Sequence, residues 1–343
     1  MIADRPRNKN GAAMDAELTP HFRPDAPARR VFIVFSTRDL PYARICIQGL
    51  LAHVVTPVVL HLIVDDADEV ARMDAALALM EIRPAHRVRT IARADIDTIA
   101  ADRFAAYPHL MAFRDGHPCW RKITDPYLLS APGDDIVILD PDLFFPNPFA
   151  FEPQPQTDIL LMHQGPNCLF PPRAVRRAFD RGIAMADHVD IGVAYAPTSA
   201  YDLPWLDDLL GKLQVADFKR YMHIEAIVWA AMCMRSGGGY LDTSVWRCWQ
   251  KGYLKRALMG LGVPGIRLLK QEPLADLKCL HVSGPSKYWV VTALDNGTLT
   301  YGNTLHDTAT RTTPVVRFTR RKFDRLQRAK TLFYGLTGRS AAR

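Results

Sequence analysis

The stretch Ile136-Val-Ile-Leu-Asp-Pro-Asp-Leu-Phe-Phe145 decides the fold of this 343-residue chain. Its first four residues form an unbroken apolar run, which is typical of a strand covered on both faces of a sheet. The run leads directly into Asp140-Pro-Asp142, so two carboxylates are expected where the buried strand ends. Ligands of open α/β sheets bind at the carboxyl ends of the strands. The stretch therefore predicts a buried strand with a polar site at its end.

The segments before and after this stretch alternate between apolar runs and helical patterns. Buried strands are expected at 31–36 and 58–64, and Pro41 opens a helix between them. Further helices are expected at 67–81, 118–130, 171–182 and 223–235, and further strands at 87–91, 158–162, 191–196, 278–282 and 288–302. The last of these contains a hairpin signal at Asn296-Gly297. This alternation predicts an α/β fold with a mostly parallel central sheet and helices on both faces.

Composition is typical of a globular protein from a reducing compartment. Hydrophobic residues make up 48% and charged residues 23% of the sequence. No apolar run reaches the roughly 18 residues of a membrane-spanning helix, and the first residues have no apolar core of signal-peptide type. The six cysteines are scattered and form no C-x-x-C pair, which argues against a zinc or disulfide framework. A cytoplasmic location is therefore expected.

Three parts are expected along the chain. Residues 1–28 lack periodicity and are expected to be a disordered lead-in, residues 29–305 form the α/β domain, and residues 306–343 form a basic tail. Within the tail, residues 311–343 hold ten Lys or Arg and one acidic residue. The rest of the chain holds 33 of the 43 basic and 35 of the 36 acidic residues. The net charge of +7 is therefore a property of the tail.

The tail has the pattern of an amphipathic helix. Phe323, Leu326, Lys330 and Phe333 lie at near-helical spacing, and basic residues surround this apolar stripe. Such a helix can lie on an anionic membrane, where each Lys or Arg contributes about 1 kcal/mol, and this would place the protein peripherally at the inner face. A helix docked on the body of the protein is the alternative interpretation. No known nucleic-acid-binding module accompanies the tail, so no nucleic-acid partner is expected.

Asp140 and Asp142 carry the ligand type that hard divalent cations prefer. Both carboxylates can reach one ion because Pro141 disrupts the strict alternation of a strand. Two other D-x-D sequences compete with this one, at 66–68 after a buried strand and at 95–97 in a polar, helical stretch. A D-x-D sequence alone is common in solvated turns, so a second motif has to decide between them.

That second motif is His281-Val-Ser-Gly-Pro-Ser-Lys287-Tyr-Trp289. The imidazole of His281 can serve as a neutral metal ligand. The turn at Gly284 can present backbone N–H groups to an anion, and Lys287 supplies a positive charge for phosphate. The motif favours the aspartates at 140 and 142 over the rival pairs. It predicts a three-ligand site made of Asp140, Asp142 and His281.

Together these motifs resemble those of the family 8 glycosyltransferases, which are retaining enzymes of the GT-A fold. Residues 31–51 resemble the first strand and helix of the family, and residues 138–148 resemble its D-x-D segment. His281-x-x-Gly284-x-x-Lys287-x-Trp289 is similar to the family's H-x-x-G-x-x-K-P-W motif, with Tyr288 in place of the proline. The resemblance spans residues 31–290 and implies a GT-A-type nucleotide-diphospho-sugar transferase fold.

The resemblance also implies a role for each matching residue. The residues that would ligate Mn²⁺ or Mg²⁺ are Asp140, Asp142 and His281. Those that would hold the nucleotide-sugar are Ser36, Thr37 and Asp39 near the base and ribose, and Asp140, Gly284 and Lys287 at the diphosphate. Lys122, or its neighbour Arg121, falls where the family has a basic residue contacting the donor. A solvated helix face is the alternative interpretation of this basic pair.

Two positions depart from the family pattern. Asp190-Ile-Gly192 stands where the family has Asn-x-Gly, and Glu225-Ala226 stands where it has an acidic residue followed by Gln. Asp190 and Glu225 are the candidate catalytic carboxylates. Retention of anomeric configuration is implied by the resemblance alone, because fold does not determine stereochemistry.

The sequence thus predicts a metal-dependent hexosyltransferase. Its donor is expected to be a nucleotide-sugar, most simply a UDP-hexose, and its acceptor a glycan or a lipid-linked sugar. A nucleotidyltransferase is one alternative, disfavoured because the loop at 36–40 contains no glycine. A non-catalytic nucleotide-sugar-binding protein of the same fold is the other, which the changes at Asp190 and Ala226 leave open.

Overall fold

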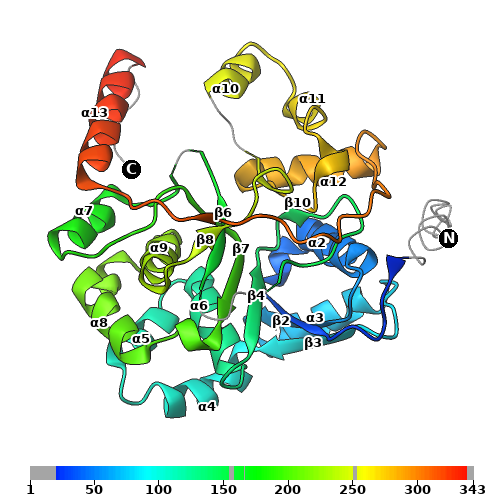
Figure 1. Cartoon of the computed structure of the whole chain (residues 1–343), viewed down its shortest axis with the longest axis horizontal. Helices are drawn as coiled ribbons and strands as arrows, with labels where there is room; N and C mark the ends of the chain where they lie inside the picture. Colours follow the sequence, from blue (N-terminus) through cyan, green and yellow to red (C-terminus); the bar gives the residue numbers. More distant parts are fainter. Residues whose placement is uncertain (1–20, 154–157, 166, 250–252, 338–343) are drawn as a thin grey trace.

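The computed structural model describes residues 21–153, 158–165, 167–249 and 253–337. Its centre is an eight-stranded mixed sheet with helices on both faces (Figure 1). The strands of this sheet, in spatial order, are β11 (Thr313–Pro314), β8 (Gly239–Tyr240), β6 (Leu160–His163), β7 (Val189–Pro197), β4 (Asp135–Leu139), β1 (Arg29–Val34), β2 (Val58–Val64) and β3 (Arg87–Ala92). A three-stranded sheet contains β5 (Leu143–Phe144), β10 (Cys279–His281) and β9 (Trp246–Cys248).

The helices follow the alternation that the sequence predicts over most of the chain. Those of the first half are α2 (Leu40–His53), α3 (Ala67–Leu77), α4 (Arg93–Arg103), α5 (Pro108–Arg114) and α6 (Arg121–Leu128). Those of the second half are α7 (Pro172–Asp180), α8 (Leu203–Leu213), α9 (Ile224–Ser236), α10 (Tyr253–Gly260), α11 (Gly265–Leu269), α12 (Lys287–Asp295) and α13 (Arg320–Thr337).

The large sheet has a parallel half and a mixed half. β1 pairs in parallel with β2 and β4, and β2 pairs in parallel with β3. β7 is antiparallel to both β4 and β6, whereas β6 and β8 are parallel. The expected parallel sheet is therefore confirmed for β1 to β4, and the strands beyond β4 alternate in direction. Asp140 follows β4, at the border between the two halves.

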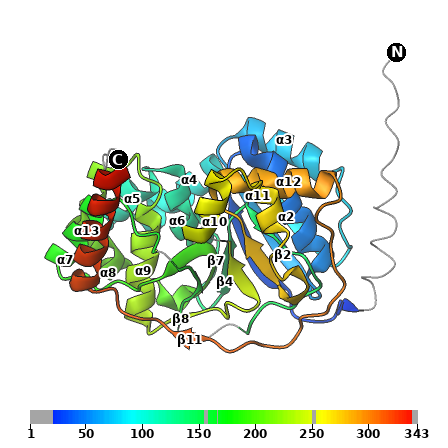
Figure 2. The ribbon, with the colours of Figure 1, turned by 90° about the horizontal axis from the view of Figure 1, so that it is seen from above.

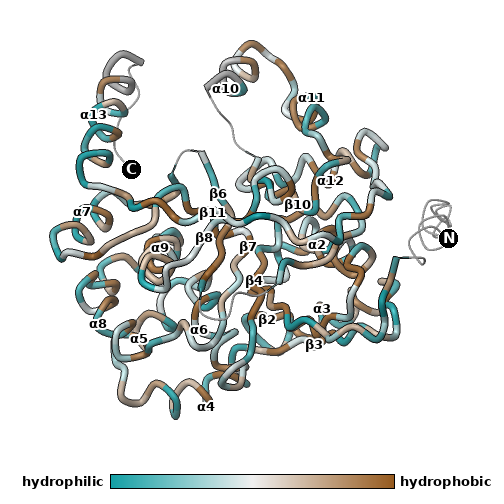
Figure 3. Tube along the Cα trace, in the orientation of Figure 1, coloured by the Kyte–Doolittle hydropathy of each residue, from teal (hydrophilic) through white to brown (hydrophobic). Residues whose placement is uncertain are grey.

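β4 shows why the central sheet needs helices on both faces. Ile136 and Ile138 pack into a core that contains residues of α4, α5, α6, α8 and α9. Val137 and Leu139 pack into a second core on the other face, which contains residues of α2 and α3. Successive side chains of a strand point to opposite faces, so the whole run is buried. Figure 3 shows the hydrophobic residues concentrated along these central strands.

One expected strand region is wrong. Residues 288–302 form α12 and a short irregular segment instead of a hairpin. Val290 and Ala293 lie three residues apart and are both buried, which is the spacing of one helix face. Gly297 adopts a φ of +71° just after the helix ends, so the Asn-Gly pair ends a helix here and does not join two strands. A helix stop and a hairpin turn share this local signal.

The chain after α12 returns across the molecule to the far edge of the large sheet (Figures 1 and 2). There β11 pairs antiparallel with β8, and α13 follows. Phe323 of α13 is buried beside Phe179 and Phe318, and Leu326 packs against the same core. These two residues of the predicted apolar stripe therefore face the body, whereas the side chain of Phe333 lies outside the described residues.

The expected lead-in is described only in part. Residues 1–20 lie outside the described residues. Residues 21–28 approach the body, since the backbone N–H of Arg23 donates to the carbonyl of Val55 at 2.8 Å. No helix among the described residues has the length and apolarity needed to cross a bilayer.

Candidate active site

The structure brings Asp140, Asp142 and His281 together. Asp142 leads into β5, and β5 pairs antiparallel with β10, whose last residue is His281. This pairing places Nε2 of His281 3.2 Å from Oδ1 of Asp142 and 3.9 Å from Oδ2 of Asp140. One ligand atom from each of the three residues lies within 4.8 Å of the other two. Strand pairing within the small sheet therefore brings the D-x-D motif and the His281 motif together.

The facing atoms of this cluster are in contact but form no well-directed hydrogen bond among the described residues. Oδ1 of Asp142 and Nε2 of His281 are both buried and lie 3.2 Å apart as an ion pair. A buried polar atom without a partner is costly, so its presence needs a physical reason. Two carboxylates and one imidazole nitrogen are a donor set that suits a divalent cation. The residues present thus fit a divalent cation held between Asp140, Asp142 and His281.

The other ring nitrogen of His281 is fixed from behind by Asp190. Nδ1 of His281 donates to Oδ1 of Asp190 at 2.8 Å, which leaves Nε2 to face the two aspartates. Burial would lower the pKa of His281, but Asp190 and Asp142 raise it well above its ordinary value. Burial would also raise the pKa of Asp142, but His281 and Lys287 hold it below its ordinary value. Without a cation, a proton on His281 balances part of the carboxylate charge.

Two residues of β7, Asp190 and Gly192, lie directly behind the imidazole of His281. The backbone N–H of Gly192 donates to Oδ1 of Asp190 at 2.9 Å. A Cβ on Gly192 would lie 2.5 Å from Nδ1 of His281, so any larger residue would displace the ring. Cys248 of β9 donates to Oδ2 of Asp190 at 3.1 Å. Both oxygens of Asp190 are therefore engaged behind the imidazole.

Lys122 connects the candidate metal ligand to the candidate catalytic glutamate. Its Nζ donates to Oδ1 of Asp140 at 2.6 Å and lies 3.2 Å from Oε2 of Glu225. Burial would lower the pKa of Lys122, but Asp140 and Glu225 raise it well above its ordinary value. For Glu225, burial is the largest cause and raises the pKa to about 8, while Lys122 opposes the shift. Lys122 is thus a buried cation between the side-chain carboxyl groups of Asp140 and Glu225.

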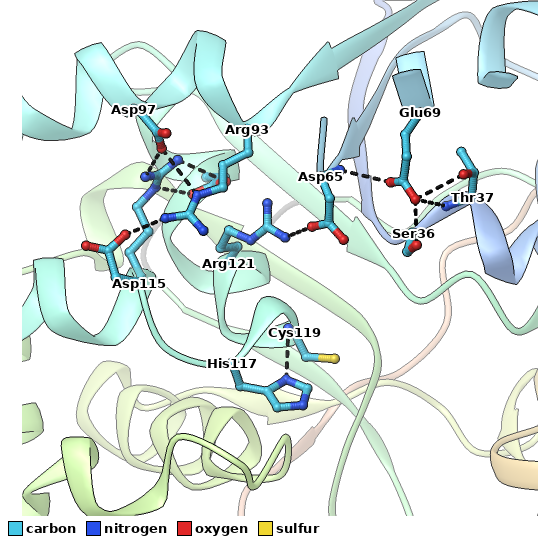
Figure 4. Close-up of polar contacts among 12 residues, drawn as sticks. Ser36, Thr37, Asp65, Glu69, Arg93, Asp97, Asp115, His117, Cys119 and Arg121 are labelled. Atoms are coloured by element: carbon cyan, nitrogen blue, oxygen red, sulfur yellow. Dashed lines mark hydrogen bonds and ion pairs between the residues drawn. The ribbon is translucent and has the colours of Figure 1, made fainter. Parts of the chain in front are cut away.

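The structure separates the two basic residues that the sequence left as alternatives. Lys122 donates to Asp140. Its neighbour Arg121 forms an ion pair with Asp65 at the end of β2 (Figure 4). Both side chains are buried, so neither lies on a solvated helix face. Of the two, only Lys122 contacts the metal-ligand cluster.

Ser36 and Thr37 are organised by a residue that sequence reasoning missed. Oε1 of Glu69 accepts hydrogen bonds from the Ser36 hydroxyl at 2.6 Å and from the Thr37 hydroxyl and backbone N–H at 3.0 Å (Figure 4). Its Oε2 accepts from the backbone N–H of Asp65 at 3.0 Å. Glu69 therefore joins the loops that follow β1 and β2. The D-x-x-E pattern of Asp66 to Glu69 is a capping signal that could have drawn attention to it.

The first turn of α2 and the His281 motif meet at Tyr42. Lys287 opens α12 and donates to the hydroxyl of Tyr42, and it lowers the pKa of nearby Asp142. Burial raises the pKa of this Tyr42 hydroxyl above its ordinary range, and the nearby carboxylate of Asp39 adds to the shift. Gly284 adopts a φ of +65° in the short 3₁₀ turn before α12, a conformation that favours glycine. The structure thus places Lys287 beside the cluster, with Tyr42 between Lys287 and Asp39.

The rival aspartates have local structural roles. Asp66 caps α3 by accepting from the backbone N–H of Glu69, and Asp95 accepts from the backbone N–H of Ala92 at the start of α4. Asp97 pairs with Arg114. Neither rival pair belongs to a cluster of potential metal ligands among the described residues.

No family model matches the sequence, and no curated protein is similar to it in sequence. Solved structures similar to the chain include mouse xyloside xylosyltransferase 1, with 11% identity and a TM-score of 0.48, over 76% of this chain and 98% of that one. They also include galactosyltransferase LgtC in complex with donor and acceptor sugar analogs, with 13% identity and a TM-score of 0.47, over 80% and 97%. Glycosyltransferase GlyE of Streptococcus pneumoniae has 10% identity and a TM-score of 0.43, over 81% and 66%.

These structures are all glycosyltransferases. Their TM-scores lie below 0.5.

Proposed function

We propose that the chain is a metal-dependent glycosyltransferase that moves a hexose from a UDP-sugar to a glycan or lipid-linked acceptor, with retention of configuration. The observation that carries this proposal is the convergence of Asp140, Asp142 and His281 at the end of β4, where the facing atoms of Asp142 and His281 are buried without a well-directed hydrogen bond among the described residues. Breaking a sugar–phosphate bond develops negative charge on a diphosphate. A divalent cation at these residues, Mn²⁺ or Mg²⁺, would neutralise that charge.

The positive side chains around the cluster suit an anionic donor. Lys287 lies at the amino end of α12 and lowers the pKa of Asp142. We propose that Lys287 and the turn at Gly284 contact the diphosphate. We assign the base and ribose to the loop of Ser36, Thr37 and Asp39, which Glu69 holds in place. The hydroxyls of Ser36 and Thr37 are already engaged by Glu69, so their role would be to shape this loop.

The two candidate catalytic carboxylates have different environments. Asp190 is 3% exposed and has both oxygens engaged, so we propose that it positions His281 and does not contact the sugar. Oε2 of Glu225 is buried and lies 3.2 Å from Nζ of Lys122, with no well-directed hydrogen bond among the described residues. We propose that Glu225 is the carboxylate near the reacting sugar. Lys122 contacts both Glu225 and Asp140, and we propose that its positive charge determines how readily each of them ionises.

The test is a screen of nucleotide-sugars for Mn²⁺-dependent hydrolysis or transfer. We expect one UDP-hexose to be hydrolysed, and we expect Asp142→Asn to reduce the rate at least about a hundredfold because it removes a charged ligand. Asp68→Asn is the matched control, since it alters a D-x-D aspartate outside the cluster and should keep the wild-type rate. Full activity in Asp142→Asn would contradict the proposal. Metal-dependent UDP binding without turnover on any nucleotide-sugar would instead identify a binding protein.

We also propose that α13 makes a peripheral electrostatic contact with an anionic membrane. Phe323 and Leu326 face the body, so the contact cannot rest on the apolar stripe alone. Arg321, Arg325 and Arg328 of the same helix are exposed and form no described ion pair. Their charge supports a membrane contact, which would suit a lipid-linked acceptor.

A further inference from the structure

We propose that Asp190, Cys248 and His281 form a second cation site, suited to a thiophilic divalent ion such as Zn²⁺ or Cd²⁺. This site would use Nδ1 of His281, the ring nitrogen that faces away from Asp140 and Asp142. One ligand atom from each of the three residues lies within 4.8 Å of the other two. Cys248 is the residue that sequence reasoning missed here, since an isolated cysteine carries no motif.

The geometry of the site comes from two sheets. Cys248 and His281 are directly paired in the register of β9 and β10, so their side chains lie next to each other. Asp190 of β7 approaches both, with Oδ1 2.8 Å from Nδ1 of His281 and Oδ2 3.1 Å from Sγ of Cys248. Ligand atoms of one tetrahedral zinc ion lie roughly 3 to 4 Å apart, so small displacements would admit the ion. Oε1 of Gln164, 3.6 Å from Sγ of Cys248, offers a fourth donor.

The donor set determines which ion fits. One thiolate, one imidazole nitrogen and one carboxylate are ligands that select Zn²⁺ and its soft relatives over Mg²⁺ and Mn²⁺. Before binding, His281 carries a proton on each ring nitrogen. Binding replaces the thiol proton of Cys248 and the Nδ1 proton of His281, both of which leave to solvent, and the Nε2 proton stays on the ring. No electrons are transferred. The hydrogen bonds that Asp190 now accepts from these two groups become bonds to the ion.

The two cation sites exclude each other because they share one imidazole. A neutral imidazole has a single lone pair, so it ligates through Nε2 or through Nδ1 while the other nitrogen keeps its proton. An ion on Nδ1 places a proton on Nε2, which then faces Asp140 and Asp142. A thiophilic ion would therefore displace the hard cation and inhibit the enzyme. This competition, unlike the site itself, rests on the proposed function of the Asp140 and Asp142 site.

The test uses the full-length, metal-free chain. Cd²⁺ is titrated in while the ultraviolet charge-transfer absorption of the cadmium–thiolate bond is followed, and Zn²⁺ is then added as a competitor. We expect Cys248→Ser to weaken the strongest site at least about tenfold, because serine keeps the hydrogen bond to Asp190 but is a poor ligand for Cd²⁺. Cys233→Ser is the matched control, since Sγ of Cys233 donates to the carbonyl of Ile159 at 3.4 Å and lies outside the cluster. It should keep the wild-type affinity.

Paramagnetic resonance of Mn²⁺ separates the two sites. Asp142→Asn should lose Mn²⁺ binding and keep Cd²⁺ binding, Cys248→Ser should show the reverse, and Cd²⁺ should release Mn²⁺ from the wild type. Equal Cd²⁺ affinity in wild type and Cys248→Ser would overturn the site, and simultaneous binding of both ions would overturn the competition. Cys248→Ala serves if the serine variant does not fold, as judged by its melting curve. If the chain transferred no sugar, the Cd²⁺ titration would still give the same result. The cation site at Cys248 and the proposed glycosyltransferase function can therefore be disproved independently.

Discussion

His281 is the residue on which most of the candidate site depends. Asp142 and Asp140 face its Nε2, and Asp190 binds its Nδ1. A carboxylate behind a histidine fixes the ring orientation and raises the basicity of the facing nitrogen, which is a common arrangement behind metal ligands. The negative charges of Asp190 and Asp142 raise the pKa of His281 when no cation is bound. Protons and metal ions are therefore expected to compete for this nitrogen.

Gly192 provides a test of this arrangement without changing any ligand. Gly192→Ala would add a Cβ 2.5 Å from Nδ1 of His281 and force the ring to move. We expect the affinity for Mn²⁺ to fall roughly 10- to 100-fold, the range seen when groups behind a metal ligand are altered. Titration calorimetry measures the affinity. Gly260→Ala is the control, since a Cβ there meets no atom within 4 Å, and an equal loss in both variants would contradict the role of Gly192.

Glu225 provides a test based on pH. Its pKa rises from the ordinary 4.5 to about 8, so between these values the folded state holds a proton that the unfolded state has released. The free energy of unfolding of the wild type should therefore fall as pH rises through this window. Glu225→Gln does not titrate, so its stability relative to the wild type should increase between about pH 5 and about pH 8. Urea unfolding with a chelator present measures this difference. A constant or decreasing difference would show that Glu225 is ionised in the folded protein.

At the scale of elements, the small sheet of β5, β10 and β9 has the largest effect on the site. β10 carries His281, β5 connects it to Asp142, and β9 carries Cys248. These strands contain two or three residues each, so their own hydrogen bonds provide little stability. Apolar packing against α11 and α12 supports them, with Leu269, Leu280 and Val290 in one core. The helix that sequence reasoning expected to be a hairpin is thus part of the support for the metal ligands.

The helix α13 provides a prediction at the same scale. The double variant Arg325→Glu and Arg328→Glu should reduce binding to anionic phospholipid vesicles about tenfold or more, because each exposed basic residue contributes about 1 kcal/mol. High salt should weaken wild-type binding, since it screens exposed charges. Vesicle sedimentation measures both effects.

The control for α13 is the double variant Arg87→Glu and Arg89→Glu. It makes the same change in net charge on exposed residues of β3. Equal binding of the two double variants would mean that total charge, and not the helix, determines attraction to the membrane.

At the scale of the whole molecule, ligand binding should increase the thermal stability of the protein. A ligand that binds only the folded state at a hundred times its dissociation constant stabilises that state by about 2.7 kcal/mol. We expect Mn²⁺ and UDP together to raise the melting temperature by more than the sum of their separate effects, because the cation joins the protein to the diphosphate. Differential scanning fluorimetry measures this. Asp142→Asn should abolish the joint effect, and a full UDP shift without metal would contradict a metal-bridged donor.

Much of the fold could be predicted from local patterns. The apolar run at 136–139 predicted a strand buried on both faces, and β4 confirms it. Gly237 ends α9 with a left-handed φ of 74°, as the glycine run after this helix predicted. The error at 288–302 arose because Asn-Gly occurs both in hairpins and after helices, so packing decides between them.

The sequence by itself determined where the buried strands run and narrowed the D-x-D pairs to the two that follow such a strand, because both depend on neighbours within a few positions. It also indicated His281 as the partner, through a motif. Only the tertiary structure decided that His281 lies between two sets of ligands, Asp140 and Asp142 on one side and Asp190 and Cys248 on the other. Asp190 and His281 are 91 residues apart in the chain. Their contact depends on how two sheets pack, and no local pattern of residues encodes that packing.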